Sequence, residues 1–418
     1  MKHILLMLSL ASISLLNACQ NHNKPFPDDL PEYNKEYLSD WQEGYLDIHQ
    51  ISTGRGDAAF LILPDGTTML VDAGDLGKFT GSQEIMPVKP NESKRPGEWI
   101  ANYIKHFSKP LNNEGAIDYA IITHFHDDHI GSNGSYAIDV PGVPYRLTGI
   151  TQVGHILTIK ELVDRAWPDY DEMTAGKDVA RGDIDNYKKF VADRTSKGLE
   201  TVRFEVGADK QFPLKNDAAA YPEFNIRNIA CNGYIWTGEG KNYKPVFTNE
   251  TMKKLDENNS SCALQLSYGD FDWFTGGDLE GRGHSDDMET SVGALIGETD
   301  VVVANHHAYS DAMNDSFIMN TKPRAFIIPV WDWYHPQPVT LDAMLSQKLY
   351  KEEREVYAAG LVEGNRTRLG DNGQKIMPAG HIVVRVYPGG KKYQIFVLND
   401  NTTSYEIIYK TGEIDSRK

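Results

Sequence analysis

The chain has 418 residues, 40% of them hydrophobic and 24% charged, and it carries a formal net charge of −17. These fractions are those of a folded protein and exclude wholesale disorder, and the length allows two or three domains. The acidic balance disfavours a nucleic-acid partner, because a surface that binds phosphates needs clustered Lys and Arg.

The N-terminal segment is typical of an export signal. Lys2 and His3 precede an apolar run over residues 4–16, and a helix of that length, about 20 Å, is too short for a hydrocarbon core of about 30 Å. The sequence Leu16-Asn17-Ala18-Cys19 resembles the lipobox of bacterial lipoproteins. The resemblance implies a lipoprotein signal peptide over residues 1–18, lipid attachment at Cys19 and a polar tether over residues 19–44. The protein would then be exported and anchored in the bacterial cell envelope, with Gln20 favouring the outer membrane. An ordinary signal peptide with a chance cysteine is the alternative.

The rest of the chain interleaves predicted strands and helices. Apolar patterns predict, in chain order, strands over residues 45–51, 58–63 and 68–71, a helix over 97–107, strands over 118–123 and 148–153, and helices over 159–166 and 185–195. Further strands are predicted over residues 261–268, 271–275, 301–304, 325–330, 381–387 and 393–398. This order favours one α/β layered domain over residues 45–410, with an insertion at about residues 168–245.

The strongest motif is Thr123-His124-Phe125-His126-Asp127-Asp128-His129, directly after the strand predicted over residues 118–123. Residues i and i+2 of an extended segment point to one face, so His124 and His126 can converge on one metal ion. Asp128 and His129 lie where the strand should turn into a helix, and they can face a second ion. Imidazole and carboxylate ligands suit Zn²⁺, and also Mn²⁺ or Fe²⁺. A polar loop with hydrogen-bonded histidines is the alternative.

This motif resembles the HxHxDH signature of the metallo-β-lactamase superfamily, and the resemblance extends over roughly residues 45–400. It implies an αββα sandwich of two halves, with two divalent metal ions at the edge of the sheets. Asp72, after the third predicted strand, matches the family aspartate that braces the histidine loop. Asp278, after Gly276-Gly277, matches the carboxylate that bridges the two metals.

Other segments resemble the competence-channel (ComEC-type) branch of that superfamily, and surface phosphorylcholine esterases share a similar layout. The matching segments are Gly54-Arg55-Gly56-Asp57-Ala58, Asn258-Asn259-Ser260-Ser261 and His306-His307. The branch usually reads His-His-Gly-Ser, but here Ala308 and Tyr309 follow the histidine pair.

The resemblance also implies roles for four further histidines. His307 would bind metal and His306 would face the substrate, although the two could be exchanged. His155 would be the third ligand of the first metal, or else a loop histidine. His335, in Tyr334-His335-Pro336, would contact the substrate or support the ligands, or else be a turn residue.

These residues predict a metal-dependent hydrolase in which a metal-bound hydroxide attacks a small ester. Asp128 or His306 would relay the proton. A phosphodiester is favoured, because two ions can serve both the attacking and the leaving oxygen. An extracellular nuclease, or a solute-binding lipoprotein on a retired hydrolase fold, are the alternatives. The expected partners are a small anionic or ester substrate and, through Cys19, the membrane.

Two further groups of residues have open interpretations. An aromatic group could form a pocket wall for a choline-like cation or could be ordinary packing residues. Its members are Trp167, Tyr170, Trp331, Trp333 and Tyr334. In an exported protein, Cys231 and Cys262 could pair, or they could remain two buried thiols.

Overall fold

A computed structural model describes residues 35–77, 85–170 and 178–417. The chain divides into two compact units, Met1–Glu36 and Tyr37–Lys418. The signal peptide predicted over residues 1–18, Cys19 and the predicted tether up to residue 34 lie outside the described residues. Among the helices that are described, none combines the length and the apolar character needed to cross a membrane.

The second unit is an α/β structure with two mixed sheets. The first sheet has the strand order β17-β16-β15-β1-β2-β3-β4-β5-β6, and β18 pairs with β16. Its strands are β1 (Leu46–Gln50), β2 (Ala59–Ile62), β3 (Thr68–Val71), β4 (Ile117–Ile121), β5 (Ile159–Asp164), β6 (Glu200–Arg203), β15 (His381–Val386), β16 (Lys392–Leu398), β17 (Ile407–Lys410) and β18 (Ile414–Asp415). The strands from β3 to β6 are parallel, and the other neighbours are antiparallel.

The second sheet repeats this division into a parallel and an antiparallel part. Its order is β14-β13-β12-β11-β10-β7-β8-β9, with β11 to β14 parallel. Its strands are β7 (Phe224–Cys231), β8 (Tyr234–Trp236), β9 (Tyr243–Pro245), β10 (Ala263–Tyr268), β11 (Phe271–Thr275), β12 (Val301–Val303), β13 (Ala325–Pro329) and β14 (Glu355–Ala359).

The alternation of side chains along the strands builds three cores. In β3, Met69 and Val71 join a core shared with strands of the second sheet, whereas Leu70 joins a core shared with helices. In β13, Ile327 joins the core shared between the sheets and Phe326 joins a separate helix-facing core. Because successive side chains of a strand point to opposite faces, the two sheets pack face to face and helices cover their outer faces.

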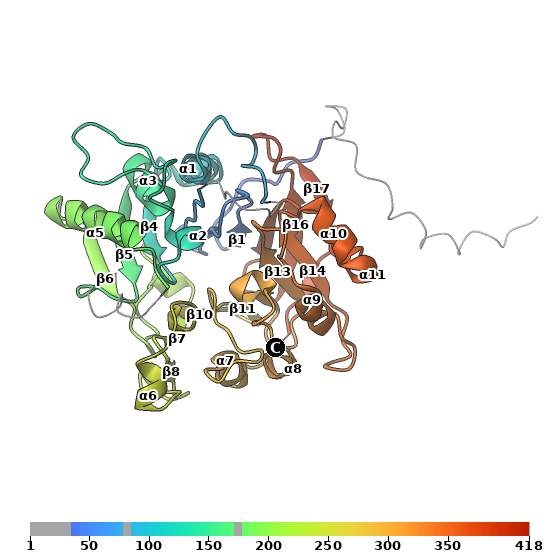
Figure 1. Ribbon diagram of the computed structural model, residues 1–418. Helices are drawn as coiled ribbons and strands as arrows, with labels where there is room; N and C mark the ends of the chain where they lie inside the picture. The colour runs from blue at the N-terminus through green and yellow to red at the C-terminus, as the bar shows by residue number, and fades with distance from the viewer. Residues whose placement is uncertain (1–34, 78–84, 171–177, 418) are drawn as a thin grey trace, which may run out of the picture. The chain divides into compact units, whose positions relative to one another are not determined.

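The helices fall into two groups that Figure 1 shows beside the two sheets. The helices α1 (Pro96–Phe107), α3 (Gly149–Ile156) and α5 (Arg181–Ser196) pack on the first sheet, and α7 (Glu289–Ile296), α8 (Asp315–Thr321) and α9 (Pro338–Met344) pack on the second. The remaining helices are α2 (Asp127–Ile130), α6 (Asn249–Met252), α10 (Glu363–Arg368) and α11 (Gly370–Gly373), with 3₁₀ turns η2 (Lys109–Leu111), η3 (Ala218–Ala220), η4 (Asn258–Ser260) and η5 (Asn305–Ala308).

Two predicted elements are wrong in type. Residues 148–153, predicted as a strand, lie in and before helix α3, and residues 159–166, predicted as a helix, contain strand β5. The other predicted strands and helices are confirmed, with ends that move by up to a few residues.

The predicted domain organisation also needs correction. The segment predicted as an insertion at about residues 168–245 supplies β6 to the first sheet and β7, β8 and β9 to the second, so its described part belongs to the sandwich. The compact unit begins at Tyr37, before the predicted start at residue 45, and Tyr37 bridges to Glu406. It extends past residue 410, because β18 pairs with β16.

Candidate metal centre

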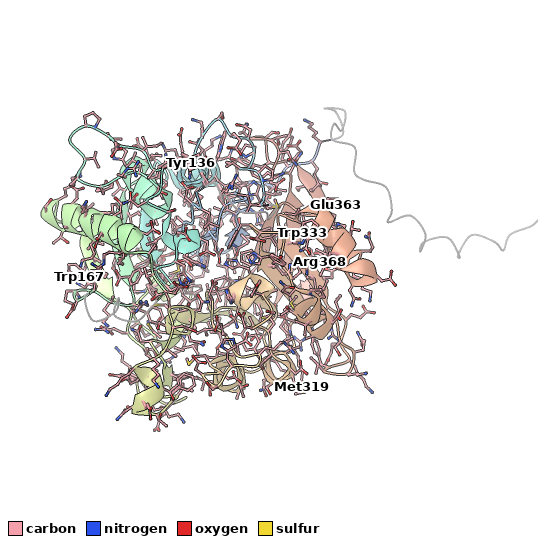
Figure 2. The ribbon with its side chains drawn as sticks, in the orientation of Figure 1. Tyr136, Trp167, Met319, Trp333, Glu363 and Arg368 are labelled. Carbon is pink, nitrogen blue, oxygen red and sulfur yellow. The ribbon has the colours of Figure 1, made fainter. Side chains whose placement is uncertain are left out.

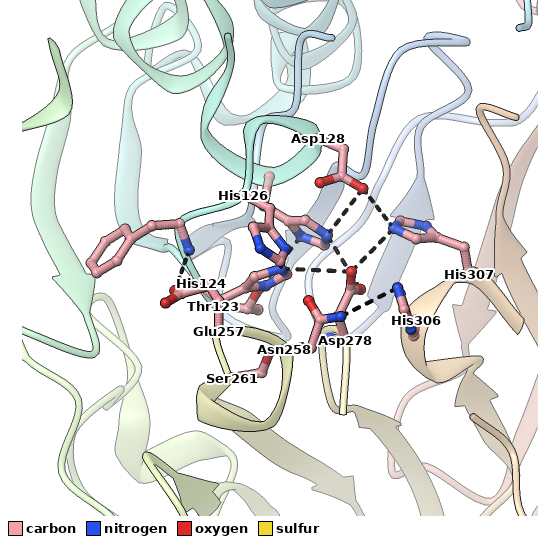
Figure 3. A network of polar contacts seen from close by, with 12 residues as sticks. Thr123, His124, His126, Asp128, Glu257, Asn258, Ser261, Asp278, His306 and His307 are labelled. Atoms are coloured by element: carbon pink, nitrogen blue, oxygen red, sulfur yellow. Dashed lines mark hydrogen bonds and ion pairs between the residues drawn. The ribbon is translucent and has the colours of Figure 1, made fainter. Parts of the chain in front are cut away.

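The residues that carry the candidate chemistry follow the carboxyl ends of parallel strands in both sheets. Asp72 follows β3 and the segment 123–129 follows β4, while Asp278, the His306–His307 pair and Trp331 follow β11, β12 and β13. Open α/β sheets bind ligands at such carboxyl ends. Side chains from the two sheets meet there, as Figure 3 shows.

The histidine loop turns from β4 into the short helix α2. His124 Nε2 lies 3.1 Å from His126 Nδ1, so the two rings converge as their spacing predicts. His126 Nε2 lies 3.0 Å from the carbonyl oxygen of Asp178. A Cβ at Gly74 would lie 1.8 Å from the carbonyl oxygen of Asp128, so only glycine allows this close approach to α2.

Asp278 lies among the imidazoles of both halves. Its Oδ1 is 3.2 Å from His129 Nε2, and its Oδ2 is 3.6 Å from His124 Nε2 and 3.5 Å from His307 Nε2. Asp128 Oδ2 lies 3.0 Å from His307 Nε2 and 3.8 Å from His129 Nε2. Donor atoms of His124, Asp128, His129 and Asp278 all lie within 4.8 Å of one another, and all four residues are buried. This group could hold a metal ion.

Hydrogen bonds determine which ring nitrogens face the group. His307 Nδ1 lies 3.1 Å from the carbonyl oxygen of Pro329, which can only accept, so Nδ1 carries the proton. His129 Nδ1 is 2.8 Å from Asp72 Oδ2 in the same way. In each neutral ring the Nε2 lone pair therefore faces carboxylate oxygens, an arrangement that needs a proton or a cation between them. His129 Nε2 is buried without a hydrogen-bond partner among the described residues. This donor set fits a divalent cation.

The neighbouring carboxylates and imidazoles shift one another's pKa values when no metal is bound. Burial lowers the pKa of His307, but Asp278 and Asp128 outweigh it and raise this pKa to about 10. Burial likewise opposes the charged form of His129, whose pKa the neighbouring carboxylates raise well above its ordinary value. Burial favours the protonated form of Asp278, but His129, His307 and His124 outweigh it and hold its pKa well below the usual range. The pKa of His124 is lowered, first by burial and then by His129. Without a metal, protons on His129 and His307 therefore offset the carboxylate charge.

The backbone that presents the ligands is left-handed at several non-glycine residues. Asp72 has φ 59°, and His306, His307 and Ala308 have φ 43°, 52° and 57°. Each such residue costs on the order of 1–2 kcal/mol, and strain of this kind is concentrated at functional sites. Ala308 keeps a conformation that favours glycine, with its side chain buried in the core beneath the second sheet.

Asp72 is in the bracing position that the family resemblance implies. Its carboxylate accepts hydrogen bonds from the backbone N–H of Thr123 at 2.8 Å and from Thr123 Oγ1 at 2.7 Å, and it also contacts His129 Nδ1. It therefore fixes both the start of the histidine loop and the orientation of one ligand.

A buried ion pair that the sequence did not indicate also supports the loop. Glu257 and Arg165 are fully buried and form an ion pair. Glu257 Oε1 accepts the backbone N–H of Phe125, between His124 and His126, at 2.8 Å. The Arg165 guanidinium lies 4.6 Å from the centre of the Phe125 ring. A charge before Asn258-Asn259 is unremarkable as a sequence pattern, so only the fold reveals this contact.

The segment after Glu257 touches the candidate centre from the other half. Ser261 Oγ accepts the backbone N–H of Asp278 at 3.2 Å. Asn258 Nδ2 donates to Glu280 Oε1 at 2.7 Å and lies 3.3 Å from His306 Nε2. The Asn258–Ser261 segment therefore positions the backbone of Asp278 and the ring of His306.

His306 contacts acidic residues outside the group of His124, Asp128, His129 and Asp278. Its Nδ1 lies 2.7 Å from Asp311 Oδ1 and 3.5 Å from Glu280 Oε1. Its side chain is 19% exposed, against 1% for His307. Of the pair, His307 is therefore the one whose ring reaches Asp128 and Asp278.

His335 packs on the ligands instead of facing solvent. Its ring stacks on His307 with centroids 4.8 Å apart at 15°, and meets Trp331 edge-on at 4.8 Å. Trp331 Nε1 donates to Asp128 Oδ2 at 2.9 Å. His335 thus packs on the His307 ring, and Trp331 holds the Asp128 carboxylate.

The other members of the predicted aromatic wall are dispersed. Tyr170 is buried and donates its hydroxyl to Asp164 Oδ2 at 2.7 Å. Figure 2 shows Trp167 and Trp333 well separated on the molecule. Arg368 lies 5.6 Å from the ring centre of Tyr334. Among the described residues these aromatics do not form one wall, which favours the packing interpretation.

The structure does not bring His155, a predicted metal ligand, to the candidate centre. His155 is exposed in the last turn of α3, and no described contact joins it to the candidate centre. Helix α3 replaces the strand expected over residues 148–153, and His155 is exposed on that helix.

Comparison with known proteins adds little to this geometry. No model of a known protein family matches the chain, and no curated protein matches it. Among solved structures, the chain is similar to a protein of unknown function from Enterococcus faecalis V583 at 10% identity, with a TM-score of 0.29, over 81% of this chain and 74% of that chain.

Proposed function

We propose that this protein is a metal-dependent hydrolase of the metallo-β-lactamase superfamily that hydrolyses a small phosphodiester with two divalent ions. The observation that carries the proposal is the convergence of His124, His129 and His307, from the two sheets, on one buried carboxylate, Asp278. The two mixed sheets with helices on their outer faces are compatible with the αββα sandwich of that superfamily.

In this proposal His124 and His126 would hold one ion, and Asp128, His129 and His307 would hold the other. Asp278, which contacts His124, His129 and His307, would be the carboxylate available to both. Zn²⁺ suits these ligands best, with Mn²⁺ or Fe²⁺ as alternatives. The ions, when bound, polarise the ester and activate water at neutral pH.

The chain's own residues supply orientation and proton transfer. Asp72 and Pro329 fix the Nδ1 protons of His129 and His307, which leaves each Nε2 free to bind. Asp311 faces His306 Nδ1 at 2.7 Å, so His306 can accept or release a proton at Nε2. With a net charge of −17, a small anion that reaches a cationic centre is favoured over a long nucleic acid.

The test is hydrolysis of a substrate panel with and without a chelator. The panel contains phosphodiesters, phosphomonoesters, lactones, β-lactams and DNA. We expect a phosphodiester to be cleaved fastest, His126→Ala and Asp278→Ala to abolish that activity, and His155→Ala to retain it as the matched histidine control. Wild-type rates in either ligand variant would refute the site, and cleavage of DNA alone would replace the substrate class with a nuclease.

We also propose that the chain is an exported lipoprotein anchored through Cys19, on the basis of its lipobox-like sequence. Labelled palmitate should be incorporated into the wild-type chain and not into Cys19→Ser. Equal labelling of both would refute the anchor.

A further inference from the structure

Two thiols that the candidate centre does not use lie side by side in the core between the sheets. Cys231 Sγ and Cys262 Sγ are 3.4 Å apart, and the residues are 2% and 0% exposed. Both are free cysteines in this structure. Neither thiol belongs to a group of potential metal ligands among the described residues.

The strand register brings these cysteines to positions that suit a covalent link. Ala230 in β7 faces Ala263 in β10 in an antiparallel pair, and one further step in that register places Cys231 opposite Cys262. Facing residues in antiparallel strands have Cα atoms about 4.5–5.5 Å apart, within the range of about 4.4–6.8 Å seen in disulfides. Closing the bond therefore requires rotation of side chains and little movement of the backbone.

We infer that Cys231 and Cys262 form a structural disulfide bond when the chain folds in the presence of a low-molecular-weight disulfide. One cysteine thiolate attacks a sulfur of oxidised glutathione and displaces one glutathione thiolate. The second cysteine attacks the protein sulfur of the mixed disulfide and displaces the other. The protein loses two protons and two electrons, and oxidised glutathione is reduced to two molecules of glutathione.

Burial sets when this exchange can occur. The pKa of the Cys262 thiol is raised well above its ordinary value by burial, with Cys231 adding to the effect. A buried thiol with a raised pKa is a poor nucleophile, so the native pair exchanges slowly in either direction. The bond therefore forms before the two sheets close over it and resists reductants afterwards.

The link would stabilise the second sheet directly behind the candidate centre. The backbone N–H of Cys262 donates to the carbonyl oxygen of Thr123 at 2.9 Å, at the start of the histidine loop. The preceding residue, Ser261, holds the backbone of Asp278. A bond from Cys262 to β7 would thus fix the register of the strand pair from which both contacts arise.

The experiment uses the full chain carrying Cys19→Ser, so that only the buried pair can react. The protein is refolded from denaturant in a glutathione redox buffer or in a reducing buffer, then alkylated under denaturing conditions and analysed by peptide mass mapping. We expect a cross-linked peptide containing both cysteines and no alkylation after oxidative refolding. Two alkylated cysteines in natively folded protein from the oxidising buffer would overturn the inference.

Thermal unfolding gives a second readout that does not depend on hydrolysis. The cysteines are 31 positions apart. For a loop of that size in a chain this long, protein refolded in the reducing buffer should have a Tm about 5 °C below that of protein refolded in the oxidising buffer. The Cys231→Ala, Cys262→Ala double variant should show the same Tm in both buffers. A redox-independent Tm in the chain that retains both cysteines would show that the bond does not stabilise the fold.

Discussion

Substitution of Glu257 tests whether the buried ion pair positions the histidine loop. Glu257→Gln keeps the shape of the side chain, and its amide oxygen can still accept the Phe125 N–H. The amide nitrogen, however, faces the Arg165 donors, and the fully buried guanidinium loses the negative charge of Glu257. Removing one partner of a buried ion pair costs about 3–5 kcal/mol. Loss of a residue that orients a metal ligand lowers metal affinity by about 10–100-fold.

Urea unfolding of the metal-free protein measures the first effect, and zinc competition with a chromophoric chelator measures the second. Glu250→Gln is the matched control, because Glu250 is exposed and lies 3.6 Å from Lys254 in a surface pair. That control should change the unfolding free energy by less than about 0.5 kcal/mol. The double variant Arg165→Met, Glu257→Leu should recover stability without recovering zinc affinity, because the Phe125 N–H remains without its acceptor. If Glu257→Gln matches the control in both measurements, the positioning role is refuted.

Three further predictions concern the ligands and the core. Asp72→Asn should weaken zinc binding by roughly 10–100-fold, because the amide has one acceptor oxygen and cannot accept hydrogen bonds from both Thr123 and His129. Unchanged zinc affinity in the same competition assay would contradict the bracing role of Asp72. Zinc binding should release protons near pH 7 and weaken as the pH falls, because His129 and His307 have raised pKa values in the metal-free protein. Calorimetry in buffers of different ionisation enthalpy should show this proton release as binding heats that depend on the buffer. Burial lowers the pKa of His381 to about 3, so between pH 6.5 and 3 the unfolded chain binds more protons than the folded chain. The unfolding free energy should therefore decrease by up to roughly 4–5 kcal/mol as the pH is lowered through this range. His381→Asn should flatten that dependence relative to wild type, and parallel pH profiles would contradict the assignment.

The sequence identified the histidine loop because spacing after a strand is a local property. His124 and His126 converge through the i, i+2 geometry of one extended segment, and Asp128 and His129 follow in the turn into α2. Asp278 and His307 were found only through resemblance to a family pattern, since contacts between distant segments depend on the packing of both sheets.

The two incorrect elements show where tertiary structure overrides local pattern. Residues 148–153 are rich in β-branched side chains, but Gly149 must approach the carbonyl oxygens of Ala73 and Ile130, where a Cβ would lie 2.3 and 2.5 Å away. Thr148 N–H also bonds to Thr151 Oγ1 at 2.9 Å, which favours the first turn of α3. In β5 the apolar residues fit both helical spacing and a strand buried on both faces, with Leu162 and Val163 in different cores.

The positioning residues were beyond the reach of the sequence for a related reason. Glu257 and Arg165 read as ordinary charged residues, and only their complete burial identifies them as a pair. Ala308 stands where glycine was expected, and its left-handed backbone became evident only in the fold.

Hydrolysis of a chromogenic phosphodiester by the zinc-loaded protein, followed through chelation and reloading, tests directly whether the protein is a metal-dependent hydrolase. We expect activity that disappears with the chelator, returns with about two equivalents of zinc and is absent in Asp278→Ala. Full zinc binding without hydrolysis of any ester in the panel, or hydrolysis that survives complete removal of the metal, would contradict this function.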